Sequence, residues 1–357
     1  MITVEDCKVV KPFIQQVKTM IKKLLLLSLF LLLLYFLFWP LPIQPVAWQA
    51  PLDTGYRGKF ESNSNLAEIQ RLDIAGGHGP EAIAVDSDGL IYTSTHEGWI
   101  MRFDPAMERT ERWVKTGGRP LGLAFATNGD LIVADAYLGL LAIAPNCQIS
   151  VLADTMMGQA ILYADDVDVA PDGRIWFSDA SSKFGARQSG GTYEASLLDL
   201  MEHGGHGRLL VHDRTTNTTS VALDGLQFAN GVAVSSAGDY VLVNETGMYR
   251  VVRLWLEGER SGQSEIVIDN LPGFPDNIVR APDGNFWIGL VSPRSKSLDQ
   301  LADKPFVRKI VQRLPSFLRP SAAHYGHVFK MDGQGNVLIS LQDPLGTYHT
   351  NTGAVEL

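Results

Sequence analysis

The sequence predicts an all-β protein, a six-bladed β-propeller with an incomplete last blade, preceded by one N-terminal transmembrane helix. Two observations carry this prediction: an apolar run near the N-terminus, and five segments of one pattern that recur after residue 55.

Acidic residues outnumber basic ones by 39 to 30, which gives a net charge of −9. A nucleic-acid partner is therefore excluded, because phosphate binding needs a basic face.

The apolar run covers residues 24–39 and ends before Pro40, a residue that stops helices. Its sixteen residues span about 24 Å as a helix, slightly less than a bilayer core. Lysines before the run and Trp39 at its end can make up the difference by reaching the lipid headgroups. We expect a signal anchor here, which makes the membrane one partner of the protein.

The charges around the run predict its orientation. Residues 1–23 hold five lysines and two acidic residues, so the N-terminus is expected in the cytoplasm and the body in the periplasm, the lumen or the extracellular space. A cleaved secretion signal is the alternative, although residues 47–50 lack the small-x-small pattern of a cleavage site. The predicted division is a cytoplasmic N-terminus, a transmembrane anchor, a linker and a propeller, at residues 1–23, 24–43, 44–54 and 55–357.

The five repeats each hold an alternating apolar strand, a turn closed by glycine and a second apolar strand. Their turn glycines lie 40, 44, 65 and 46 residues apart, the length of one four-stranded propeller blade with insertions. We expect strands around residues 56–75 to complete a sixth blade with the C-terminal strands. The next turn glycine would fall near residue 360, so the chain is expected to be truncated before its closing strands. The repeats cover residues 81–89, 121–129, 165–173, 230–238 and 276–284.

The repeats place oxygen-bearing side chains at one position, eight residues before each turn glycine. Equivalent positions on successive blades surround the central axis, and calcium prefers six to eight oxygen ligands. The sequence therefore predicts one calcium ion in the central tunnel, either structural or catalytic. The alternative is that these side chains bond to the local backbone, as Asp and Asn often do. The residues at this position are Glu81, Leu121, Asp165, Asn230 and Asp276.

Three further residues are assigned to the same site. Asp166 and Asn277 follow two of the ring residues and are expected to add to the ring or to face the substrate. We assign Asn277 to the metal and Asp166 to the substrate. His78 lies three residues before Glu81 and is expected to reach the same mouth as a proton carrier.

Several of these motifs together resemble the strictosidine synthase-like family. They include GGHGPEAIAVDSDGLIYTSTHEGWIMRFD at 76–104 and LPGFPDNIVRAPDGNFWIGL at 271–290. The resemblance covers residues 55–357 and implies a six-bladed propeller. The related gluconolactonases and paraoxonases hold calcium through one residue per blade, which implies this role for Glu81, Asn230 and Asp276. It also implies that Asp276 activates water as the catalytic base.

Other positions depart from the relatives. Asp165 stands where those relatives have asparagine, so the site is more acidic here. Leu121 stands where paraoxonases have their catalytic histidine, and residues 351–353 lack the glutamate of strictosidine synthase. The function expected is therefore a calcium-dependent hydrolase of a small-molecule lactone or aryl ester. A non-catalytic, calcium-stabilised binding module is the alternative, and a condensing lyase is less favoured.

Two insertions are longer than a turn requires, at about 185–206 and 292–324. Within the second, residues 304–314 alternate basic and apolar side chains with a helical period. This segment is interpreted as a lid over the tunnel mouth, as a second membrane contact, or as a surface helix packed on the rim.

Overall fold

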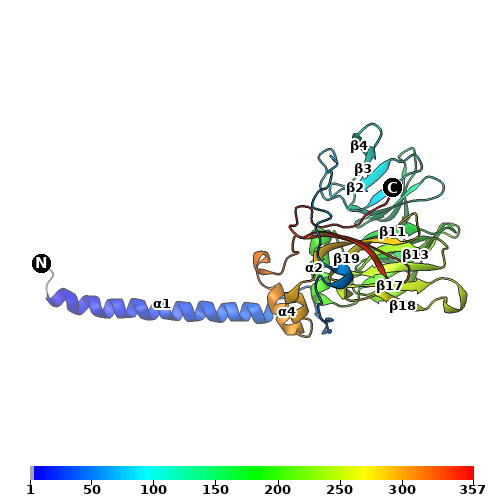
Figure 1. Cartoon of the computed structure of the whole chain (residues 1–357). Helices are drawn as coiled ribbons and strands as arrows, with labels where there is room; N and C mark the ends of the chain where they lie inside the picture. The colour runs from blue at the N-terminus through cyan, green and yellow to red at the C-terminus, as the bar shows by residue number, and fades with distance from the viewer. Residues whose placement is uncertain (1–3) are drawn as a thin grey trace.

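The computed structural model describes residues 4–357, in which one long helix projects from a body of β-sheets (Figure 1). The helix α1 (Val4–Phe38) contains a candidate membrane span, Phe13–Phe38, with a mean hydropathy of 2.3 and none of it buried in the protein. An exposed apolar helix of this length fits a single-pass membrane anchor. By length and composition it also fits a signal sequence.

The body consists of five four-stranded antiparallel sheets, each ordered along the chain from the first strand to the fourth. Blade 1 holds β1 (Ile83–Val85), β2 (Ile91–Ser94), β3 (Trp99–Asp104) and β4 (Arg109–Lys115). Blade 2 holds β5 (Pro120–Phe125), β6 (Leu131–Asp135), β7 (Gly139–Ile143) and β8 (Ile149–Ala153). Blade 3 holds β11 (Ala164–Val169), β12 (Ile175–Asp179), β13 (Gly207–Asp213) and β14 (Thr218–Leu226). Blade 4 holds β15 (Ala229–Val234), β16 (Tyr240–Glu245), β17 (Arg250–Trp255) and β18 (Ser264–Ile268), and blade 5 holds β19 (Gly273–Arg280), β20 (Phe286–Pro293), β21 (Gly326–Met331) and β22 (Val337–Asp343).

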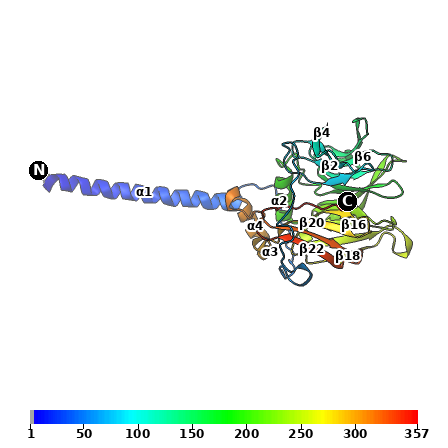
Figure 2. The same ribbon diagram turned by 45° about the horizontal axis from the view of Figure 1, so that its top comes forward.

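Short elements lie between and around the blades. A two-stranded hairpin, β9 (Thr155–Met156) with β10 (Gln159–Ala160), follows blade 2. The insertions predicted in blades 3 and 5 form helices α2 (Thr192–Glu202), α3 (Lys296–Gln300) and α4 (Pro305–Gln312). Figure 2 shows these helices on the side of the body that faces α1. The 3-10 turns are η1 (Gly58–Phe60), η2 (Thr246–Met248), η3 (Gly258–Arg260) and η4 (Ser316–Leu318).

The five repeats coincide with the first two strands of the five blades, as predicted. All five turn glycines have a positive φ between 77° and 86°, a backbone conformation that side chains with a Cβ rarely adopt. The turn glycine therefore fixes where the first strand of each blade ends. The five glycines are Gly89, Gly129, Gly173, Gly238 and Gly284.

The prediction of a six-bladed ring is not confirmed, because residues 4–357 form five four-stranded sheets. The stretch at 61–82 contains no strand. Leu66 in this stretch donates its N–H to the carbonyl oxygen of Gln342, in β22, at 2.9 Å. The C-terminal segment lies between β19 and β1, where Asn277 N donates to Thr352 O at 2.9 Å and Thr352 Oγ1 donates to Glu81 O at 2.6 Å. One extended segment with no strand hydrogen-bonded along its outer side is not a sheet, so a sixth four-stranded blade is not confirmed among residues 4–357.

The segment after α1 packs on the body. Val46 N donates to Glu202 O at 2.8 Å, and Trp48 N donates to Ala302 O at 3.1 Å. The Trp48 ring stacks on His203 with centroids 4.0 Å apart. Residues 44–54, predicted as a linker, thus connect α1 to the helices α2 and α3.

A buried histidine in blade 5 predicts acid sensitivity of the fold. His327 is fully buried against Tyr56 and Phe60, and burial lowers the pKa of its imidazole from 6.5 to about 3. The unfolded chain binds this proton near pH 6.5, so the stability from neutral His327 is present above that pH and is lost as the pH falls toward 3. We expect this residue to remove about 2 kcal/mol from the free energy of unfolding between pH 7.5 and 5.

Urea unfolding of the full chain in detergent at the two pH values measures this loss. His327→Phe should show a smaller pH dependence, whereas His78→Gln, at a side chain that is 82% exposed, should match the unsubstituted chain. Equal pH dependence in all three proteins would contradict the assignment.

Candidate active site

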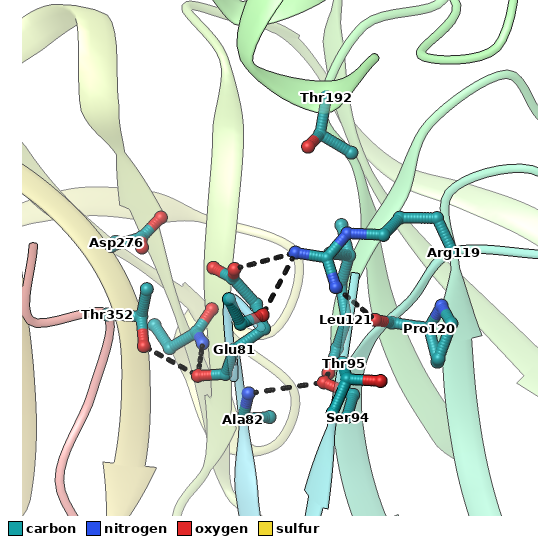
Figure 3. A network of polar contacts seen from close by, with 12 residues as sticks. Glu81, Ala82, Ser94, Thr95, Arg119, Pro120, Leu121, Thr192, Asp276 and Thr352 are labelled. Carbon is teal, nitrogen blue, oxygen red and sulfur yellow. Dashed lines mark hydrogen bonds and ion pairs between the residues drawn. The ribbon is translucent and has the colours of Figure 1, made fainter. Parts of the chain in front are cut away.

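The predicted ring residues surround a single cavity of about 710 Å³. Each sits in or just before the first strand of its blade, and the shared register brings these positions to the axis of the sheets. Thr352 from the C-terminal segment lines the same cavity and bonds to Glu81 (Figure 3). The ring residues that line the cavity are Glu81, Leu121, Asp165, Asn230 and Asp276.

Three carboxyl groups in this cavity repel one another. Asp165 and Asp276 are 3% and 7% exposed. Burial raises the pKa of both carboxyls well above their ordinary value, and the charge of Glu81 raises them further. Burial also raises the pKa of Glu81, against the effect of a neighbouring arginine. Such a cluster of buried carboxyl groups favours binding of a cation.

Several oxygens at the ring lack a hydrogen-bond partner among the described residues. Asp165 Oδ2 and Asn230 Oδ1 are buried at the ring, and Asn277 Oδ1 is buried next to it, among residues that line the neighbouring cavity. Buried polar atoms are rarely left unpaired, so each of these oxygens could accept a ligand. Carboxylate and amide oxygens suit calcium, and this donor set fits the ion. Across residues 4–357, however, no three His, Cys, Asp or Glu side chains are already gathered as a metal cluster.

Arg119 is part of the site and was not predicted from the sequence. Its side chain is 5% exposed, and its guanidinium Nη2 lies 3.4 Å from Glu81 Oε2 and 3.4 Å from Gly79 O. Figure 3 shows Glu81 with Arg119 on one side and Asp276 and Thr352 on the other. The arginine supplies one positive charge to a site that carries three acidic groups.

Arg119 belongs to a second set of residues in register, two positions before the ring residues. Side chains two apart on a strand share a face, so this set lines the cavity next to the ring. Repeating the register count at this offset would have found it in the sequence. Its lining members are Arg119, Tyr163, Phe228 and Phe274.

Helices contribute the rest of the wall. Leu197, Leu200 and Met201 from α2 and Leu298 from α3 line the cavity. Tyr163 Oη donates to Thr192 O at the start of α2, at 3.0 Å. The cavity therefore has mainly apolar walls and a ring of polar groups, a composition typical of small-molecule sites.

Three predicted site residues lie elsewhere. Asp166 and Asn277 line a second cavity, of about 330 Å³, because a residue one position along a strand points to the other side. Asp166 Oδ2 accepts the N–H of Val232 at 2.9 Å and thus connects blades 3 and 4. His78 lines neither cavity; its exposed ring pairs with Glu97 at 2.7 Å. Asp166 and His78 are not brought together with Asp276.

Comparison with known proteins agrees with the resemblance seen in the sequence. The family described as "Strictosidine synthase" matches residues 165–259, and "Strictosidine synthase-like, N-terminal" matches residues 58–103. The adipocyte plasma membrane-associated protein of Bos taurus is 33% identical over 86% of this chain and 77% of its own length.

Solved structures share the fold at low sequence identity. A gluconolactonase from Xanthomonas campestris aligns with a TM-score of 0.56 at 15% identity, over 78% of this chain and 79% of its own. Regucalcin from Agrobacterium tumefaciens, described as a calcium-binding protein, aligns with a TM-score of 0.52 at 16% identity, over 76% of each chain. At these identities the likeness concerns the fold alone.

Proposed function

This chain belongs to the strictosidine synthase-like family, and we propose that it is a calcium-dependent hydrolase of lactones or aryl esters. The observation that carries the proposal is the ring of carboxylate and amide oxygens around one apolar-walled cavity of about 710 Å³. The gluconolactonase and the calcium-binding regucalcin support it, because both share the fold of this chain. We further propose that α1 holds the protein in a membrane with its N-terminus in the cytoplasm, and that residues 350–357 mark the inner strand of a sixth blade.

The residues proposed to hold the ion are the four oxygen-bearing residues of the ring. Bound calcium would polarise the substrate carbonyl and offset the negative charge that develops on its oxygen. The set is Glu81, Asp165, Asn230 and Asp276; Asn277, expected as a fifth ligand from the sequence, lines the neighbouring cavity instead.

Asp276 is the proposed base. Its carboxylate accepts a proton from water as the water oxygen attacks the carbonyl carbon. The bond between that carbon and the alkoxide or phenoxide oxygen then breaks, and the leaving oxygen takes up the proton. Asn230 Nδ2 donates to Asp276 Oδ1, which holds the carboxylate in place. A carboxylate beside a cation is a weak base, so we expect modest, promiscuous turnover.

The aromatic residues of the second register set suit the substrate class. Tyr163, Phe228 and Phe274 offer flat apolar surfaces beside the ring. An aryl or acyl group can pack there while its carbonyl lies at the ring.

A non-catalytic binding module is the second candidate. Arg119 favours it, because its guanidinium lies 3.4 Å from Glu81 and offsets part of the negative charge at the ring without a metal. In that case the ring stabilises the propeller and the cavity binds a ligand without converting it.

An assay of phenyl acetate and γ-lactone hydrolysis by the full chain in detergent separates the two candidates. We expect turnover in calcium and at least tenfold less in chelator. Asp88→Asn, at an exposed position of the β1–β2 turn, is the matched control and should behave like the unsubstituted chain. A folded protein that converts none of the esters or lactones would support the binding module instead.

A further inference from the structure

One wall of the cavity lies next to the C-terminal end of α1. Tyr35 Oη in α1 donates to Arg313 O at 2.9 Å, and Arg313 Nε donates to Trp39 O at 2.9 Å. Gln312, the neighbour of Arg313, lines the cavity, and so do residues 319–323. Figures 1 and 2 show α4 against this end of α1 in both views. The rim of the cavity thus directly contacts the helix that fits a membrane anchor.

Helix α2 also contacts both the cavity and the chain that follows α1. Leu197, Leu200 and Met201 line the cavity. Glu202, the last residue of α2, accepts the N–H of Gln44 through Oε2 at 2.6 Å and the N–H of Val46 through its carbonyl at 2.8 Å. The chain that follows α1 is therefore bound to both helices of the rim.

The surface of the rim is apolar and basic. Phe306, Phe317 and Leu318 are 57%, 81% and 57% exposed. Lys309 and Arg319 lie in the same segment, as does Lys304, which pairs with Asp303 at 3.0 Å. Exposed aromatic residues beside basic ones are typical of surfaces that lie in a membrane interface.

Helix α4 is firmly attached to the body, so its outer face has a fixed direction. Arg308 is fully buried and donates to Met201 O at 3.0 Å and to Ala302 O at 3.1 Å, as well as to Val46 O. The side of α4 that carries Arg308 packs against the body, and Phe306 lies on the surface.

We propose that residues 304–319, the rim segment, form a second membrane contact that holds the cavity mouth against the bilayer spanned by α1. The substrate then enters from the lipid phase and is an amphiphilic ester or lactone with a long acyl chain. The substrate class rests on the proposed hydrolase function; the membrane contact does not. An acyl chain would lie along the apolar walls, with its carbonyl at the polar ring.

Fluorescence quenching tests the membrane contact without any activity. Phe317→Cys in a full chain with Cys7→Ala and Cys147→Ala carries an environment-sensitive fluorophore, in vesicles of phosphatidylcholine and phosphatidylserine. Met107→Cys is the control: Met107 is 72% exposed in the β3–β4 turn, at the opposite end of the blade from Glu81. We expect nitroxide lipids to quench the label at 317 at least twofold more than the label at 107. Equal quenching at both positions would overturn the contact.

Paired substrates test the lipid route. The double variant Phe306→Glu, Phe317→Glu is assayed in the same vesicles. It should reduce turnover of a twelve-carbon aryl ester at least fivefold and leave turnover of water-soluble phenyl acetate unchanged. The control Met107→Glu should change neither rate. Equal losses for both substrates would overturn the lipid route. No turnover of either substrate by the unsubstituted chain would refute the hydrolase and the substrate class, while strong quenching at 317 would still support the contact.

Discussion

Asp276→Asn is expected to reduce calcium-dependent hydrolysis at least 100-fold while the propeller stays folded. The amide has nearly the shape of the carboxylate but cannot accept a proton from water, and the loss of general-base catalysis costs 10²–10⁴-fold. The substitution also removes one of three repelling acidic groups from the cavity. Hydrolysis rates and urea unfolding of the same sample, each in calcium and in chelator, measure both effects.

The two effects distinguish a catalytic residue from a structural one. In chelator, Asp276→Asn should unfold no more easily than the unsubstituted chain, because mutual repulsion is relieved. In calcium, it should gain less stability from the ion. Asp88→Asn should change neither quantity. Full turnover by Asp276→Asn would remove Asp276 from the mechanism.

Arg119→Gln is expected to lower the free energy of unfolding in chelator by about 3–5 kcal/mol, the usual result of removing one partner of a buried ion pair. Arg119 is the positive charge beside Glu81, and its removal leaves three acidic groups without compensation. A cation in the cavity can replace that charge. Saturating calcium should therefore restore most of the lost stability, and calcium should bind more tightly than to the unsubstituted chain.

The matched control is Arg260→Gln, because the Arg260 side chain is 54% exposed in η3 and far less buried than Arg119. Urea unfolding and calorimetric titration with calcium give the comparison. A loss of stability that calcium does not restore would show that Arg119 acts in packing alone. It would also count against a cation beside Glu81.

The ring residues of the cavity could be predicted, because the turn glycine determines which residue of the first strand of each blade lies at the ring. Counting back eight residues from the turn glycines places Glu81, Asp165, Asn230 and Asp276 in or just before the first strands of blades 1, 3, 4 and 5. Such positions converge on one cavity whatever the insertions between blades contain. The role of these residues in calcium binding and catalysis stays a prediction.

The repeat pattern does not determine which cavity the neighbouring residues face. Asp166 follows Asp165 but faces the other cavity, because strands alternate their side chains. His78 precedes β1 in a loop, where no period fixes its direction. Arg119 is not predicted by the position eight residues before the turn glycine, because it belongs to the position two residues earlier, where four of the five residues line the same cavity.

Contacts between distant segments carry no periodic signal. The hydrogen bonds from Tyr35 and to Trp39 join α1 to Arg313, and nothing in the spacing of these residues indicates that they meet. The prediction of a sixth blade depends on strands around residues 56–75 pairing with the C-terminal strands, and the repeat pattern does not show which extended segments pair. The position of Thr352 beside Glu81 depends on that pairing.

The most direct test of the account is a single calcium titration of the full chain, read by phenyl acetate hydrolysis and by calorimetry in the same buffer. We predict one calcium-binding site. The rate of hydrolysis should rise with calcium and reach half its maximum at the calcium concentration that half-fills this site. A variant with Asp165→Asn and Asp276→Asn should lose both the hydrolysis and the binding heat. Hydrolysis that is unchanged in chelator, or calcium binding that survives both substitutions, would contradict the claim that this ring of oxygens is a calcium-dependent active site.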